Sequence, residues 1–440
     1  MRPPRPHRAT TAHLQAVYPF VSDGSLAAAG PLIGRDLFAG AFSFDPWELY
    51  RAGRITNPNI VVLGQLGRGK SSFVKALVWR HLPFGRRAWI LDPKGEYGPL
   101  ARACGSSPIV LAPGGRTRLN PLDLPPGHPV TAGNGAGGGD GRPASELRAR
   151  ADLVASLLAS SLQRPLSPAE RTAVEMAVRH AASRSATPTL PGVVDALLDP
   201  DPGSAAEVGT DARGLASAGR DAALELRRMV RGDLAGMFDG GTSGDIDLAA
   251  PVVVLDLSAT FASPALPLVM TCATAWLQAS LGAADGVKRL VVIDEAWAIL
   301  NDLATARWSQ ATFKLSRSLG VANVVVVHRV SDLRAAGADG SAQEKLAAGL
   351  LADSETRVVF GQPPSEAAET GRMLGLGATE TEVISRLPRG VALWRVGDRS
   401  FLVEHVLGAG ERGLVDTDGA MRPNPRQFPG SGAEFSGTEG

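Results

Sequence analysis

Short apolar runs alternate with helical patterns in the first third of the chain. The run at 59–63 lies between a Pro-Asn pair and glycines, which predicts a strand buried on both faces. Apolar positions then recur at helical spacing over 69–81, and strand patterns return at 88–91 and 108–111. Strand, helix and strand in this order predict an α/β fold with a doubly wound, mostly parallel sheet.

The pattern changes after residue 131. Residues 132–141 consist mostly of glycine, which predicts a flexible loop. From 144 to 238 the apolar spacing is helical, and Ser167 with Glu170 three residues later has the form of a helix-capping box. No strand-like run interrupts this region, so we interpret it as an all-helical insertion in the α/β domain.

Strand patterns resume after the insertion and continue almost to the end of the chain. They lie at 251–257, 290–293, 321–327 and 357–360. Two further alternating runs, 391–396 and 400–406, flank Gly397-Asp398, a pair typical of a β-hairpin turn. The last residues are rich in glycine, proline and charge.

These patterns divide the chain into four parts. Residues 1–55 form a short N-terminal segment with a few strands or turns, and 56–131 together with 245–415 form the sheet domain. Residues 132–244 contain the flexible loop and the helical insertion, and 416–440 form a tail predicted to be disordered.

Charge and cysteine content restrict the class of protein. The 45 basic and 44 acidic residues leave a net charge of +1, which predicts no strong attraction to nucleic acids or anionic membranes from bulk charge alone. Cys104 and Cys272 form no disulfide framework, as expected in a reducing compartment. The uncharged stretch 257–284 contains two prolines and predicts a strand end and a buried helix, so no transmembrane segment is expected.

A phosphate-binding motif follows the first buried strand. Residues 64–71 read G-x-x-x-x-G-K-S between a predicted strand and a predicted helix, the context that a P-loop requires. Lys70 is expected to reach the β- and γ-phosphates of ATP and to assist catalysis, and Ser71 to place its hydroxyl on Mg²⁺. An ordinary glycine-rich turn is the alternative. The predicted ATP-binding residues are Gly64, Gln65, Leu66, Gly67, Arg68, Gly69, Lys70, Ser71 and Ser72.

Two carboxylates end a second apolar strand. Asp294 and Glu295 directly follow the run at 289–293. Beside a P-loop, Asp294 is expected to hold Mg²⁺ and Glu295 to act as general base for the attacking water. A base for water favours an ATP hydrolase over a kinase. The alternative is a strand that simply runs into a solvated helix start.

Other polar residues also follow predicted strands, whose carboxyl ends carry ligand sites in open α/β sheets. Asp92 and Glu96 are candidates to face the nucleotide, or else belong to a strand-terminating turn with solvated charges. His328 and Gln362 are candidates to sense the γ-phosphate, although His328 could equally be a satisfied residue at the core edge. Arg317 is a candidate to act across a subunit interface, with a surface arginine as the alternative.

Four motifs together resemble the TraC-like traffic ATPases of conjugation and type IV secretion. They are Asp92-Pro93-Lys94-Gly95-Glu96-Tyr97, Leu111-Ala112-Pro113-Gly114-Gly115, Leu119-Asn120-Pro121-Leu122-Asp123 and Ile293-Asp294-Glu295-Ala296-Trp297. These ATPases belong to the HerA–FtsK superfamily of RecA-like hexameric motors. The resemblance implies a RecA-like P-loop fold, a homo-hexamer using ATP and Mg²⁺, and a cytoplasmic location at the inner face of the membrane. Its implied partners are membrane-embedded channel proteins and DNA.

The chain departs from this family in two places. Many members have Thr-Gln where Val327-His328 stand here, and TraC-like proteins usually carry a large domain before the P-loop. Three functions therefore remain in view. The first is a motor ATPase that energises DNA or protein transfer, the second a DNA-pumping translocase of the coupling-protein or FtsK type, and the third a scaffold that binds nucleotide without hydrolysing it.

Overall fold

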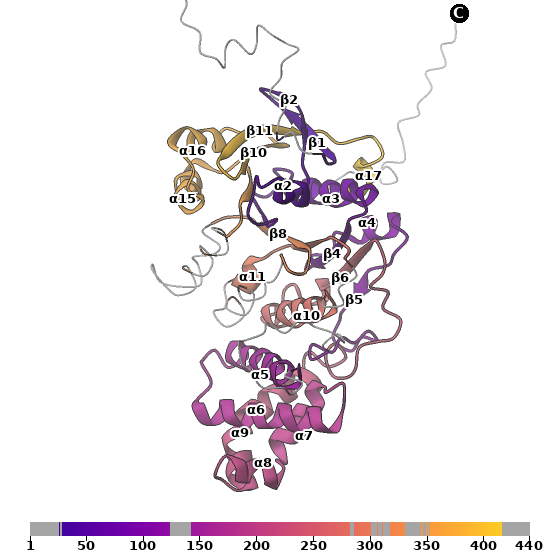
Figure 1. Cartoon of the computed structure of the whole chain (residues 1–440), viewed down its shortest axis with the longest axis vertical. Coiled ribbons are helices and arrows are strands. Elements are labelled where there is room, and N and C mark those ends of the chain that lie inside the picture. Colours follow the sequence, from indigo (N-terminus) through magenta and orange to yellow (C-terminus); the bar gives the residue numbers. More distant parts are fainter. Residues whose placement is uncertain are drawn as a thin grey trace, which may run out of the picture.

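One large sheet organises the computed structural model, which describes residues 26, 29–123, 142–281, 286–300, 306, 310, 317–330, 345, 349, 351 and 353–415 (Figure 1). Within these residues eleven strands pair in the order β2-β1-β11-β10-β9-β3-β8-β7-β4-β6-β5. The strands are β1 (Leu32–Asp36), β2 (Gly40–Ser43), β3 (Ile60–Leu63), β4 (Arg87–Asp92), β5 (Ile109–Val110), β6 (Val252–Asp256), β7 (Arg289–Ile293), β8 (Val321–Val327), β9 (Thr356–Phe360), β10 (Val391–Val396) and β11 (Arg399–His405).

The strands from β9 to β5 are parallel, and all of them except the short edge strand β5 are buried on both faces. Alternate residues of β3 belong to opposite cores, with Ile60 and Val62 on one side and Val61 and Leu63 on the other. Strands covered on both faces need apolar side chains at every position, which explains the continuous apolar run. Helices α3 (Lys70–His81) and α4 (Gly98–Ala103) supply the first core, and α10 (Leu266–Leu281) supplies the second.

The helical insertion stands between β5 and β6 in the chain. It contains α5 (Arg142–Ser161), α6 (Pro168–Arg184), α7 (Leu190–Leu198), α8 (Pro202–Glu207) and α9 (Ala212–Arg231). The predicted capping box at the start of α6 is confirmed, since Ser167 Oγ accepts from Glu170 N at 3.2 Å and Glu170 Oε2 accepts from Ser167 N at 2.8 Å.

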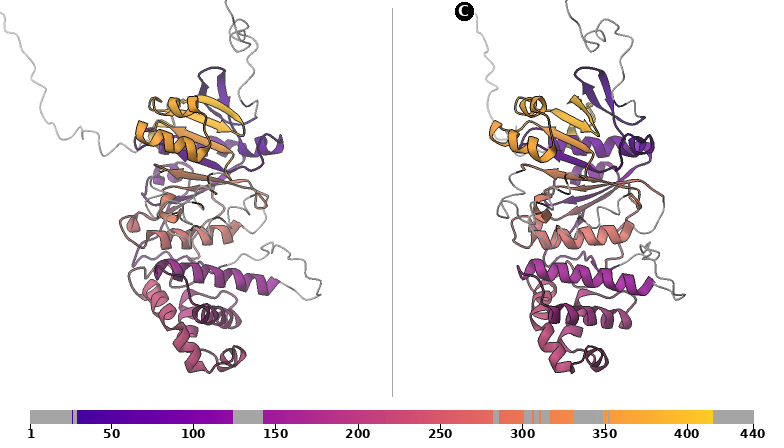
Figure 2. Two further views of the ribbon diagram at one scale, coloured as in Figure 1. Left: turned by 90° about the vertical axis from the view of Figure 1, so that its left-hand side faces the viewer. Right: turned by 60° about the vertical axis from the view of Figure 1, so that its left-hand side comes forward.

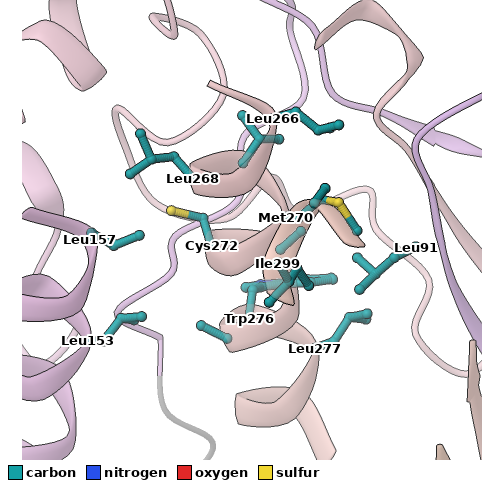
Figure 3. Packing of buried hydrophobic residues seen from close by; sticks show 14 of the residues in the cluster. Leu91, Leu153, Leu157, Leu266, Leu268, Met270, Cys272, Trp276, Leu277 and Ile299 are labelled. Carbon is teal, nitrogen blue, oxygen red and sulfur yellow. The ribbon is translucent and has the colours of Figure 1, made fainter. Parts of the chain in front are cut away.

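The insertion joins the sheet domain through α10. Figure 2 shows α10 as a layer between the sheet above and α5 below. In close view, α10 lies between Leu91 of β4 on one side and Leu153 and Leu157 of α5 on the other (Figure 3). One apolar helix thereby packs against both the sheet and the insertion within a single continuous core.

The antiparallel part of the sheet follows β9. β10 and β11 form the predicted hairpin, and β1 pairs with β11 and β2 at the outer edge. Residues that precede the P-loop by sequence are therefore part of the same sheet. Shorter helices complete the described fold: α2 (Pro46–Arg51), α11 (Trp297–Leu300), α15 (Pro364–Leu374), α16 (Ala378–Ile384) and α17 (Arg412–Val415).

The predicted fold class is confirmed, with a mostly parallel sheet, a helical insertion and a C-terminal hairpin. Among the described helices, none has the length and apolar character that a membrane crossing requires. The predicted loop at 132–141 and the tail at 416–440 lie outside the described residues.

Candidate nucleotide site

The candidate residues gather at the carboxyl edge of the parallel strands. The P-loop follows β3, His328 follows β8, Asp294 and Glu295 follow β7, and Gln362 lies just beyond β9. β8 pairs with both β3 and β7, so one strand separates the P-loop from the two carboxylates. Parallel strands end at a common edge, which is where α/β sheets bind ligands.

Two glycines shape the P-loop. Gly64 packs against β9 so closely that a Cβ there would lie 2.5 Å from Cβ of Phe360. Gly69 has φ +108°, in the left-handed region, and is the N-cap of α3. The turn directs the loop into the helix N-terminus, whose first N–H groups have no intrahelical acceptor and so suit a phosphate.

Lys70 begins α3 and folds back over the loop. Its Nζ donates to the carbonyl oxygens of Gly64 and, at 3.1 Å, of Gln65. The side chain is only 4% exposed. Ser71 is half-buried in the first turn, and Ser72 Oγ donates to the carbonyl of Val415 in α17 at 3.4 Å. The loop and the helix start therefore hold a compact cationic site.

A cavity of about 120 Å³ continues from the P-loop along α3. Gly69, Ser72, Phe73 and Ala76 of α3 and its N-cap line it, together with Gly390 and with His405 at the end of β11. A cavity of about 150 Å³ can hold one benzene ring, so this space approaches the size of a single aromatic ring. A purine base is larger than benzene, so this space beside the P-loop could hold only part of one.

His405 lies in the wall of this cavity as a neutral side chain. Trp394 Nε1 donates to its Nε2 at 3.0 Å, so Nδ1 carries the proton and donates to the carbonyl of Gly390 at 3.1 Å. Burial lowers the pKa of His405 to about 3. Phe73 and Phe360 pack against the ring, with centroids 4.5 Å and 5.2 Å away.

Asp294 is a buried carboxylate, 4% exposed. Its Oδ1 accepts from Glu295 N at 3.0 Å. Burial, together with the neighbouring charge of Glu295, raises the pKa of Asp294 to about 6. A divalent cation would favour the ionised form, and carboxylate and hydroxyl oxygens are the ligands that Mg²⁺ prefers. Asp294 and Ser71 therefore fit a magnesium site.

Glu295 is engaged at both carboxylate oxygens. Oε1 forms an ion pair with Lys94 Nζ and lies 2.5 Å from Nε2 of His328, while Oε2 accepts from Trp297 Nε1. Its φ of +53° is in the left-handed region, uncommon for a residue other than glycine. Burial alone would raise the pKa of Glu295, but hydrogen bonds with His328 and Lys94 outweigh burial and lower it to about 2.

Asp92 lies inside its own turn at the end of β4. The carboxylate is fully buried and accepts from Glu96 N at 3.1 Å and Tyr97 N at 2.8 Å. Burial raises its pKa, although the two N–H groups oppose this effect. The side chain of Glu96 turns toward Lys75 of α3, with Oε2 and Nζ 4.0 Å apart. Both residues are thus part of a structured turn, and Asp92 is not solvated.

The remaining two candidates, Gln362 and Arg317, lie at opposite ends of the parallel strands. Gln362 is 1% exposed, and its amide atoms have no hydrogen-bond partner among the described residues. It adjoins the P-loop, because the carbonyl of Gly361 accepts from Gln65 N at 3.3 Å. Arg317 is exposed and precedes β8, at the edge opposite the P-loop, where Nη1 donates to the carbonyl of Thr56 at 3.4 Å. The fold does not bring Arg317 to the nucleotide site of its own chain.

Three contacts to the carboxylates were not anticipated from the sequence. Lys94 and Trp297 contact Glu295, and the Tyr97 hydroxyl lies beside Asp294. Burial and the charges of Asp294, Asp92 and Glu96 raise the pKa of Tyr97 well above its ordinary value. All three belong to the motifs that carry the family resemblance, so those motifs were the available signal.

Comparison by sequence finds no match to a protein family or to a curated protein. Comparison by structure does. VirB4 of Thermoanaerobacter pseudethanolicus aligns with a TM-score of 0.70 at 19% identity, over 89% of this chain and 100% of that one.

The plasmid coupling protein TrwB is also similar. Its complex with ADP and Mg²⁺ aligns with a TM-score of 0.53 at 16% identity, over 88% of this chain and 93% of that one. Its complex with a non-hydrolysable ATP analogue gives 0.53 at 17% identity, over 87% and 95%. The chain therefore has the RecA-like P-loop NTPase fold predicted from its sequence, the fold that VirB4 and TrwB share.

Proposed function

We propose that the chain is a motor ATPase that energises transfer of DNA or protein by a conjugation or type IV secretion system. The observation that carries the proposal is the placement of Asp294 and Glu295 one strand away from the P-loop, at the same edge of the sheet. The structural likeness to VirB4 across 89% of the chain supports the choice of system.

Each residue has a separate task in hydrolysis. Lys70 and the N–H groups at the start of α3 bind the β- and γ-phosphates, and Ser71 and Asp294 hold Mg²⁺, which neutralises phosphate charge when bound. Glu295 accepts a proton from water as the water oxygen bonds to the γ-phosphorus. The bond between that phosphorus and the bridging oxygen breaks, and ADP and phosphate leave. Gln362, with its buried amide, senses the γ-phosphate.

The working assembly in this proposal is a homo-hexamer in the cytoplasm, at the inner face of the membrane. Arg317 lies at the edge opposite its own P-loop, so any contact with nucleotide is made to the site of a neighbouring subunit. ATP hydrolysis by this assembly drives transfer through membrane-embedded channel proteins, and DNA is a candidate for the transferred molecule.

A second function is a DNA-pumping translocase of the coupling-protein type. The alignment with TrwB over 88% of the chain favours it, although its TM-score of 0.53 is below the 0.70 of VirB4. A third function, a scaffold that binds nucleotide without hydrolysis, draws support from the engagement of both Glu295 oxygens in this conformation.

One set of measurements separates these functions. ATP turnover and oligomer size are measured for the wild type and Glu295→Gln, with and without single- and double-stranded DNA. We expect turnover that depends on the hexamer and falls by at least about 10²-fold in Glu295→Gln. Glu382→Gln, at an exposed glutamate of α16, is the matched control and keeps full activity.

The possible outcomes point to different functions. Equal rates in the wild type and Glu295→Gln would refute the role of Glu295. Strong stimulation by DNA would favour the translocase, and a hexamer that binds ATP without turnover would favour the scaffold.

A further inference from the structure

One turn contacts both carboxylates that follow β7. It spans Asp92 to Tyr97, and the Asp92 carboxylate holds it in shape by accepting from Glu96 N and Tyr97 N. From this turn Lys94 pairs with Glu295, and the Tyr97 hydroxyl lies beside Asp294. The turn therefore positions the general base through one side chain and adjoins the proposed metal ligand through another.

The contacts on Glu295 have a cost for catalysis. A general base must present a free lone pair within hydrogen-bond reach of the water that it deprotonates. Here Oε1 contacts Lys94 and His328, Oε2 accepts from Trp297, and the residue is 2% exposed. In this conformation Glu295 has little access to water.

Lys94 differs from His328 and Trp297, the other two partners of Glu295, because its side chain is a long, flexible ammonium. An ammonium group is a point charge on a flexible stem with three donors, so it can exchange one acceptor for another. Its side chain is 25% exposed, and Phe261 is the aromatic ring next to it, with Nζ 5.8 Å from the centroid. Trp297 lies two residues beyond Glu295 at the start of α11, so a short stretch of backbone ties the two together. Of the three contacts, the ion pair is the one that can open.

We propose that Lys94 is a positioning residue that restrains Glu295 in a conformation withdrawn from water, so that opening of this ion pair limits basal ATP turnover. This inference rests on the proposed ATPase function. Nζ of Lys94 also lies 3.4 Å from Nε2 of His328, which itself contacts Glu295. A residue that acts through this cluster changes the rate of the chemical step and not the binding of ATP.

The test compares Lys94→Met with the wild type, using the full chain without DNA or channel proteins. Methionine keeps most of the apolar stem and removes the charge. We expect kcat to rise by about fivefold, with KM for ATP unchanged within about twofold. Lys94→Gln, which keeps a weaker donor, should give a smaller rise. Lys288→Met, at the opposite end of β7, is the control that leaves the rate unchanged.

A double mutant shows whether Lys94 works through Glu295. If it does, Lys94→Met has no effect on the residual rate in a Glu295→Gln background, because the restrained group is gone. A purely structural role would change the rate of both backgrounds alike. Thermal unfolding of each variant confirms that it is folded.

The outcomes are distinct from those that test the proposed function. A lower or unchanged kcat in both Lys94 variants overturns the restraint, and so does an equal effect in the Glu295→Gln background. If the wild type is active and Glu295→Gln is not, the ATPase function stands in either case. If the wild type has no turnover at all, the proposed function itself fails.

Discussion

Nε2 of His328 lies 2.5 Å from Oε1 of Glu295, although the two residues follow different strands. β7 and β8 are parallel neighbours in which Ile293 pairs with Val325, and this register brings the two strand ends together. The sequence makes His328 a candidate sensor of the γ-phosphate. Its contact with Glu295 instead indicates that any influence on the phosphate passes through Glu295, the proposed general base.

Replacement of His328 should therefore affect turnover more than nucleotide binding. For His328→Ala we expect a changed kcat and an ATP dissociation constant within about twofold of the wild type, because no phosphate contact is lost. Calorimetric titration with a non-hydrolysable ATP analogue measures the binding. A tenfold weaker dissociation constant would instead place His328 on the phosphates.

Gly64 should be intolerant of any side chain. A Cβ at this position would lie 2.5 Å from Cβ of Phe360, so Gly64→Ala must displace β9 or the P-loop. We expect a loss of about 2 kcal/mol in the free energy of unfolding, typical of overpacking. Gly67→Ala is the comparison, since φ is also positive there but a Cβ would have no atom of the described residues within 4 Å beyond its chain neighbours. Chemical denaturation of both variants should show the larger loss at Gly64.

The cavity along α3 can be filled from Ala76, which is buried in its wall. If part of the nucleoside base enters this cavity, Ala76→Leu should raise KM for ATP by about tenfold while kcat changes little, because uniform binding is lost. Ala103→Leu, on an exposed position of α4, serves as the control. An unchanged KM in a folded Ala76→Leu variant would place the base elsewhere.

Acid should destabilise the fold through His405. Its pKa is about 3 in the folded chain and about 6.5 in the unfolded chain, so between these values only the unfolded chain takes up the proton. The contribution of neutral His405 to the free energy of unfolding is therefore fully present above pH about 6.5. Below that pH it falls by up to about 1.4 kcal/mol per pH unit.

The difference between the wild type and His405→Gln isolates this effect. Asp294, whose raised pKa of about 6 acts in the opposite direction, contributes equally to both proteins. Denaturant midpoints between pH 7 and pH 5 should converge as the pH falls, because the variant lacks the titrating group. Parallel midpoints over that range would show that His405 is not buried in its neutral form.

The sequence by itself was sufficient for features that depend on neighbouring residues. Glycine spacing and the following helix predicted the P-loop, and Ser167 with Glu170 predicted a helix start that the structure confirms. Apolar runs predicted the parallel strands, since a strand covered on both faces has no polar side. The capping box joins residues three apart, and the apolar run of a strand is itself a local pattern, although the strands that pair with it are distant in the sequence.

Tertiary structure alone decided which of these residues meet. Lys94 reaches Glu295 because β4 pairs with β7, and His328 reaches it because β8 pairs with β7 from the other side. Likewise β1 joins the sheet through β11, although the chain places them at opposite ends. The periodicity of apolar residues predicts that a segment is a strand, but it does not predict which other strands pair with it. The candidate base could therefore be predicted from the sequence, but the side chains that contact it could not.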